Sequence, residues 1–216
     1  MTKSMLTFVS LLCFILSVPM AVAGDHSLKG RSSIELNIGF WHESKVGNEI
    51  STAGNVSTAK SSGFIGGLSY GHWFQEGLSV NASIGLLSGE ATSSVTLSGA
   101  SQRASSVIPI LLGVRYYLPE SSFGTPVRPF LAAAVGPFLG VESKNDFFSQ
   151  ESRSETALGA RLGGGIDFLL GQTIKLGATV GYNLMTDFSS PVGARKNFSG
   201  PEFTIGFGIM FGGSDQ

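Results

Sequence analysis

Three consecutive polar residues, His42, Glu43 and Ser44, come nearest in type to the groups of a hydrolase or acyltransferase. Such chemistry needs a nucleophile, usually a serine, with a base such as histidine within hydrogen-bond reach. Adjacent residues on a strand point to opposite faces, so their proximity in sequence does not bring the side chains together. We interpret them as polar residues at a strand end and expect no catalytic residues and no enzymatic activity.

Metal and cofactor chemistry is not indicated either. The three histidines are scattered and the only cysteine, Cys13, lies in the apolar amino-terminal stretch, so no set of ligands has metal-binding spacing. The glycine-rich stretches "GLSYG" and "GARLGGG" are not followed by a helix, whose N-terminus would be needed to hold a phosphate. We expect no metal and no cofactor.

Several charged residues share a position in the sequence pattern. Each lies within an alternating segment, on the face opposite the large apolar residues. Isolated buried ions are costly, so enclosed charges of opposite sign must pair. We predict a charge network in an enclosed interior, formed by Glu35, Arg115, Arg161, Asp167 and Lys175.

The elements that would position these charges are strands. Strict alternation of apolar with small or polar residues is typical of strands whose two faces meet different surroundings. Eight such segments have about the length of tilted membrane-crossing strands. They span residues 33–41, 63–74, 78–87, 107–118, 127–141, 157–170, 173–184 and 203–211. None of their large apolar faces carries a charged residue, as expected of a surface in contact with lipid.

The connections alternate in length. Three are short, whereas four longer polar links cover residues 43–61, 88–105, 142–155 and 185–200. Short turns at one end and long loops at the other are typical of outer-membrane barrels. The sequence therefore predicts an all-β fold: an eight-stranded antiparallel up-and-down transmembrane β-barrel with short periplasmic turns and four long extracellular loops.

Aromatic residues on the predicted outer face fall near the segment ends. This placement is typical of the two membrane interfaces. We predict an aromatic girdle that includes Tyr70, Phe74, Tyr116, Phe168 and Tyr182.

Composition agrees with export to a membrane. Only 13% of the 216 residues are charged, against about 25% in a typical soluble domain. A basic start, an apolar run and Ala21-Val22-Ala23 match a secretory signal peptide, which predicts a signal peptide over residues 1–23 and a barrel domain over residues 24–216. A net charge of -1 and the absence of a basic stripe argue against nucleic acid as a partner.

The chain resembles the small eight-stranded outer-membrane β-barrel proteins of the OmpA/OmpX type. The resemblance rests on "VIPILLGVRYYL", "VRPFLAAAVGPFLG", "LGGGIDFLL" and "FTIGFGIMF", and covers residues 32–211. It implies location in the outer membrane, contact with membrane lipid and lipopolysaccharide, and insertion by the barrel-assembly machinery. The resemblance also implies a C-terminal insertion signal formed by Phe203, Ile205, Phe207, Ile209 and Phe211.

Several functions are compatible with this pattern. The first is a non-enzymatic scaffold whose surface loops contact a host surface or another protein, since function commonly lies in loops held by a rigid frame. The second is a narrow porin-like channel or a conduit for a hydrophobic ligand; large inward residues such as Phe130, Phe138, Leu111 and Ile65 argue instead for a filled interior. The third is a lipid A-modifying enzyme, and the fourth a soluble lipocalin-type barrel with its apolar face inward.

Overall fold

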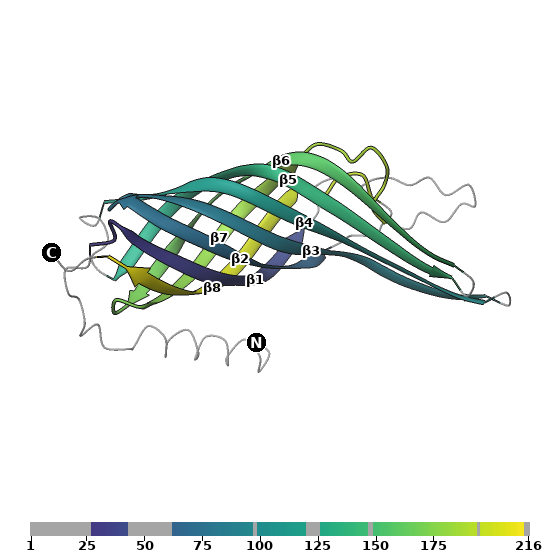
Figure 1. The fold of residues 1–216 in the computed structure, drawn as a ribbon, viewed down its shortest axis with the longest axis horizontal. Helices are drawn as coiled ribbons and strands as arrows, with labels where there is room; N and C mark the ends of the chain where they lie inside the picture. The colour runs from purple at the N-terminus through teal and green to yellow at the C-terminus, as the bar shows by residue number, and fades with distance from the viewer. Residues whose placement is uncertain are drawn as a thin grey trace, which may run out of the picture.

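The protein folds into a closed barrel of eight antiparallel strands, in which each strand pairs with its neighbours in sequence and β1 pairs with β8 (Figure 1). The computed structural model describes residues 27–42, 62–96, 99–119, 126–146, 149–193 and 195–213. The strands are β1 (Arg31–His42), β2 (Ser62–Gln75), β3 (Leu78–Thr96), β4 (Gly99–Tyr117), β5 (Val127–Asp146), β6 (Ser149–Leu170), β7 (Ile174–Met185) and β8 (Gly200–Gly212). Within the described residues, no helix has the length and hydropathy needed to cross a membrane.

Side-chain alternation explains why these segments form a barrel wall. Along β8 every second residue is exposed on the outside, from Phe203 to Phe211, while the residues between them, from Thr204 to Met210, are buried inside. Many large apolar residues of the other strands are likewise exposed on the outer surface, such as Ile34, Leu112 and Val180, whereas those of the opposite phase, such as Phe138, are buried. The predicted fold class is confirmed, and the soluble lipocalin-type alternative is wrong because the apolar face points outward.

Closure of the barrel depends on close approach between β1 and β8. The register joins Ile34 to Ile209 and Ile38 to Ile205, so apolar residues of both strands share the outer face. A Cβ atom added to Gly39 would lie 1.9 Å from the backbone oxygen of Phe203. Glycine at position 39 therefore allows the first and last strands to meet.

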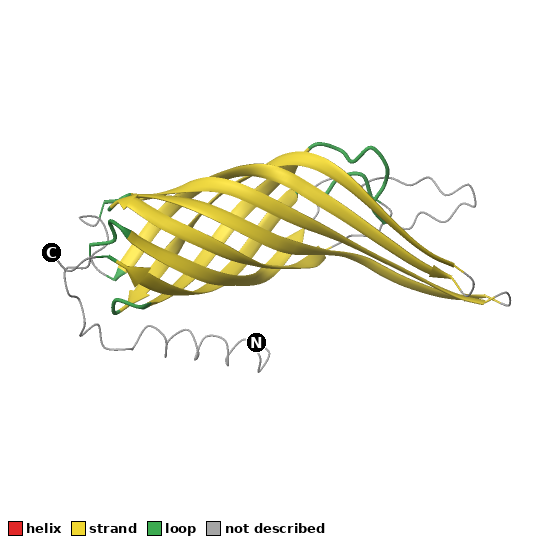
Figure 2. Cartoon of the chain, in the orientation of Figure 1, coloured by secondary structure: helices red, strands yellow, loops and turns green. Residues whose placement is uncertain are grey.

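Two of the predicted long loops are strands instead. Residues 88–105 and 142–155 mostly continue β3, β4, β5 and β6, whose paired register reaches Thr96 with Gly99 and Asp146 with Ser149. We call this part of β3–β6 the sheet extension, and Figure 2 shows it extending beyond the barrel toward the right. The prediction was wrong because polar serine and threonine residues form strands readily once a neighbouring strand supplies hydrogen-bond partners.

The two ends of the barrel differ. The loop end carries the sheet extension and the β7–β8 connection, and the turn end carries the short turns, the start of β1 and the end of β8 (Figure 1). The predicted loop at residues 43–61 lies outside the described residues. The connection at residues 186–199 is described except for residue 194 and folds against the loop end.

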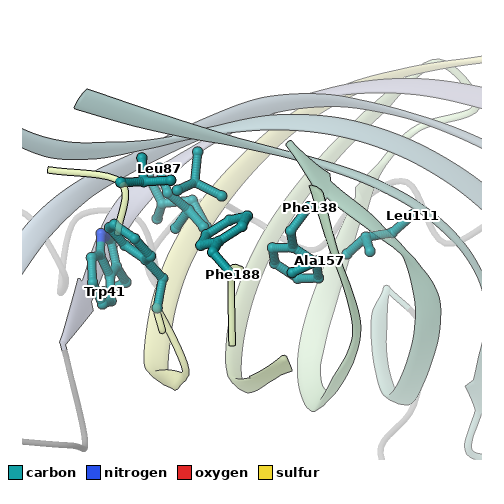
Figure 3. Close-up of a cluster of buried hydrophobic side chains, with 10 residues drawn as sticks. Trp41, Leu87, Leu111, Phe138, Ala157 and Phe188 are labelled. Carbon is teal, nitrogen blue, oxygen red and sulfur yellow. The ribbon is translucent and has the colours of Figure 1, made fainter. Parts of the chain in front are cut away.

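Two apolar clusters fill the interior near these ends. The upper cluster lies at the loop end (Figure 3) and the lower cluster at the turn end. The upper cluster contains Trp41, Ile65, Leu87, Val107, Leu111, Phe138, Ala157, Phe188, Val192 and Phe198. The lower cluster contains Leu28, Trp73, Tyr117, Phe130, Leu169 and Met210. An eight-stranded barrel is just wide enough for side chains to fill it.

Candidate functional site: the barrel lumen

Four charged side chains from four strands meet in the lumen toward the turn end. Arg115 Nη1 on β4 lies 3.2 Å from Glu35 Oε2 on β1 and 3.8 Å from Asp167 Oδ2 on β6. Lys175 Nζ on β7 lies 2.5 Å from Glu35 Oε2 and 3.2 Å from Asp167 Oδ2. Tyr117 donates a hydrogen bond of 2.8 Å to Asp167 Oδ2. We call these five residues the ion cluster.

The ion cluster is balanced in charge and almost fully enclosed. Two carboxylates face two cations, and each carboxylate contacts both. The faces of nearby aromatic rings add to this pairing, since Arg115 Cζ lies 4.8 Å from the ring centre of Phe130. Removal of any one of the four charged members would leave an uncompensated buried charge, which costs far more than the pair itself contributes.

Arg161, the fifth residue of the predicted charge network, lies in a separate group. Its Nε atom is 3.0 Å from Glu202 Oε1 and 3.1 Å from Asn183 Oδ1, and Asn183 Nδ2 donates a 2.6 Å hydrogen bond to Glu202 Oε2. Arg161 therefore does not contact Glu35 or Asp167. Glu202 and Asn183 were not among the predicted network residues, although Asn183 lies on the inward face of the segment at residues 173–184 and Glu202 continues the inward face of β8 by one residue.

A small cavity of about 90 Å³, lined by both polar and apolar residues, lies within the lumen. Its lining includes Asn37, Ser69, Asn81, Ser83, Thr179 and Thr204, and it borders both Arg115 and Arg161. A cavity of this size and polarity holds a few water molecules. The upper cluster fills the loop end of the lumen and the lower cluster fills the turn end. The cavity therefore lies between two apolar clusters.

The outer surface carries the residues predicted for the girdle and the insertion signal. Tyr70, Phe74 and Tyr116 are exposed, whereas Phe168 and Tyr182 are half-buried. The five residues of the predicted insertion signal on β8 are all exposed on the outer face. Their roles at the membrane interfaces and in insertion stay predictions.

The candidate enzyme residues are not assembled into a site. His42 is exposed at the end of β1, and Glu43 and Ser44 lie outside the described residues. Elsewhere, Ser32 Oγ lies 3.0 Å from His72 Nδ1, but the same hydroxyl is 3.0 Å from the Tyr70 hydroxyl. In the described part of the chain, the His72 ring has no carboxylate partner, so nothing orients it as a base.

A closed eight-stranded barrel with an apolar outer surface and charges confined to its lumen is a small membrane-spanning β-barrel. The model of the outer membrane protein beta-barrel domain matches residues 8–211 of the sequence. The chain therefore belongs to this family and is an outer-membrane protein, as the sequence predicted.

Solved structures show the same fold. Neisserial surface protein A is 17% identical, with a TM-score of 0.54 over 85% of this chain and 98% of that one. The attachment invasion locus protein Ail of Yersinia pestis is 18% identical, with a TM-score of 0.50 over 85% of this chain and 99% of that one. Ail in complex with the heparin analogue sucrose octasulfate gives a TM-score of 0.52. No curated protein matches the sequence.

Proposed function

We propose that this protein is a non-enzymatic scaffold that presents the sheet extension to an external protein. The observation that carries the proposal is the continued pairing of β3–β6 beyond the barrel. In that region β4 and β5 pair as far as Gln102 and Asn145, so the four strands form one sheet above the lipid-facing wall. A rigid sheet of this kind holds a binding surface at low conformational cost.

The β6 edge of the extension is the surface that fits a protein partner best. β7 pairs with β6 only from Gly159 onward, and Thr186 bonds to the backbone of Leu158. Among the described residues, none pairs as a strand with this side of β6 between positions 149 and 157. Unpaired strand edges are templates for an added strand from another chain.

The side chains along this edge are polar, as expected of an extracellular surface. Ser152, Arg153, Ser154 and Thr156 are exposed, and Arg153 pairs with Glu155 at 2.7 Å. Backbone hydrogen bonds to an added strand would supply affinity, while alternate side chains would select its sequence. The partner that this edge fits is therefore a protein with an extended segment.

A channel function has less support. The upper and lower clusters fill both ends of the lumen, and the ion cluster occupies the region between the cavity and the turn end. A lipid A-modifying activity has no assembled nucleophile and base among the described residues. The barrel therefore serves as a frame for the sheet extension.

Binding by shortened variants tests the proposal. One variant lacks residues 90–103 and 144–151, so the sheet extension is removed; its matched control lacks residues 45–59 and keeps the extension. Both are reconstituted in nanodiscs and tested on surfaces coated with extracellular-matrix proteins and, separately, with heparin. We expect binding to a protein surface by the unchanged chain and the control but not by the first variant. Equal binding by both variants, or binding to heparin alone, would contradict the proposal.

A further inference from the structure

The β7–β8 connection folds into the loop end of the barrel. Phe188, Val192 and Phe198 come from this connection, and each is at most 2% exposed. The Phe198 ring centre lies 5.7 Å from that of Trp41 and 6.1 Å from that of Phe188. Figure 3 shows Phe188 among side chains of the barrel wall. A stretch that composition marks as a polar loop thus contributes three members of the upper cluster.

The connection is a folded unit of its own. Phe188 N–H donates to Lys196 O at 2.7 Å, and Val192 N–H donates to Arg195 O at 2.7 Å. Asn197 Nδ2 donates to Asp187 Oδ1 at 2.7 Å. These internal bonds hold the three apolar side chains together independently of their contacts with the wall.

The barrel wall is shaped to receive this unit. On β5, a Cβ atom added to Gly140 would lie 2.5 Å from Val192 Cγ2 and 3.1 Å from Phe188 Cζ. Two residues further along β5, Glu142 Oε2 accepts a 3.0 Å hydrogen bond from the backbone N–H of Gly193. The small residue makes room for the apolar side chains, and the carboxylate fastens the turn that carries them.

On its lumen side, the upper cluster borders the cavity. The cavity bordered by Arg115 and Arg161 shares Ile65 with the upper cluster, so the two are in contact. Polar side chains of several strands line this cavity, including Ser83 and Thr179. Removal of the three apolar side chains would therefore take away three of the ten cluster members that lie between this cavity and the loop end.

We propose that residues 186–199 act as a plug that separates the polar lumen from external water and small hydrophilic solutes. Phe188, Val192 and Phe198 form the seal, and Glu142 fastens it through Gly193. Glu142 and Arg153 of the sheet extension contact the plug, but the seal consists of apolar side chains inside the barrel, so the proposal does not depend on the proposed binding function. Displacement of the plug would open the lumen from the loop end while the β7–β8 pairing from Asn183 with Gly200 onward keeps the barrel closed.

Cysteine labelling tests the plug. Cys13 is the only cysteine of the chain, so a Cys13→Ser background that carries Ser83→Cys places one thiol in the cavity. A positively charged methanethiosulfonate reagent is added to the protein in nanodiscs, and the labelling rate is followed by mass spectrometry. Ser154→Cys, on the exposed β6 edge, is the matched control for reagent reactivity.

The plug variant replaces residues 187–198 with a short Asn-Gly turn. We expect its Ser83→Cys thiol to react at least an order of magnitude faster than in the unchanged plug, while Ser154→Cys reacts at one rate in both backgrounds. Equal rates for Ser83→Cys in the two backgrounds, fast or slow, would overturn the proposal.

A second variant keeps the result decisive if the shortened chain does not fold. Glu142→Ala leaves the whole connection in place and removes the carboxylate that accepts the hydrogen bond from Gly193. We expect Glu142→Ala to raise the labelling rate of Ser83→Cys, by less than the plug variant does. An unchanged rate in a folded Glu142→Ala barrel would show that Gly193 and Glu142 do not hold the seal.

Discussion

Lys175 Nζ lies 2.5 Å from Glu35 Oε2 inside the barrel, where the two side chains are 1% and 3% exposed. Glu35 of β1 and Lys175 of β7 both pair with Gly208 of β8, so the contact passes over this glycine between two strands that are not direct neighbours. The ion pair therefore links parts of the wall that backbone hydrogen bonds do not join directly.

Substitution of Lys175 by methionine should destabilise the barrel strongly. Glu35 and Asp167 would then share only Arg115, which leaves a buried negative charge without compensation. We expect a loss of about 3 to 5 kcal/mol in the free energy of unfolding, measured by urea unfolding in lipid vesicles. The double variant Lys175→Met with Glu35→Gln should recover part of the loss; a single variant as stable as the unchanged chain would contradict this account of the ion cluster.

The separation of the two lumen charge groups makes a second prediction. Arg161 pairs with Glu202 and shares no ion-pair partner with Lys175. The destabilisations caused by Arg161→Met and Lys175→Met should therefore add to within about 0.5 kcal/mol in the double variant. A larger deviation in the same unfolding assay would mean that all five predicted residues form one coupled network.

Gly39 provides a test of barrel closure. Alanine at position 39 would place a Cβ atom 1.9 Å from the Phe203 backbone oxygen, which cannot move without separation of β1 from β8. We expect Gly39→Ala to abolish the difference in gel migration between boiled and unboiled samples. Gly66→Ala is the matched control, because its new Cβ would lie 3.1 Å from the Phe64 ring, which can shift, and at an ordinary contact distance of 3.7 Å from the Asn37 backbone oxygen. Normal heat-modifiable migration of Gly39→Ala would show that the seam tolerates a methyl group.

The turn end should respond to acid through Glu76. Burial acts to raise the pKa of Glu76, but hydrogen bonds from Ser27 and from the backbone N–H groups of Leu28 and Lys29 outweigh it, and the pKa lies below its ordinary value of 4.5. The charged carboxylate thereby fastens the segment that carries Leu28 into the lower cluster. Its contribution is complete above pH 4.5 and is lost as pH falls through the lowered pKa.

Trp73 fluorescence reports on this attachment. Trp73 belongs to the lower cluster with Leu28, and replacement of Trp41 by phenylalanine leaves it the only tryptophan. We expect a red shift of its emission as pH falls below 4.5, and the same shift already at pH 7 in Glu76→Ala. If the Glu76→Ala variant and its Trp41→Phe parent gave the same emission at every pH, Glu76 would not hold the Leu28 segment in place.

The wall of the barrel could be predicted from the sequence because a lipid-facing strand obeys a strict rule. Each of the eight segments must exclude charge from one face, and that rule identifies both the strand and its orientation. The same alternation predicted that Glu35, Arg115, Asp167 and Lys175 point into the barrel. Their pairing was not predictable, because it depends on the stagger between strands around the barrel.

The regions beyond the wall were less predictable. No lipid constrains the sheet extension, so its polar residues have the composition of loops even though they pair in register. The plug was missed for the opposite reason: Phe188 and Phe198 stand ten residues apart in a polar stretch without strand periodicity. Only the folded connection brings them together against Trp41.

The large apolar face of each strand contacts lipid while the other face is enclosed. Leu111 and Leu112 test it as adjacent residues on β4 that are 1% and 63% exposed. Methyl-labelled leucine in nanodiscs should give nuclear Overhauser effects from the lipid acyl chains to the Leu112 methyl groups and none to those of Leu111. Acyl-chain contacts at Leu111, or water contacts in place of lipid at Leu112, would contradict the orientation of the barrel wall.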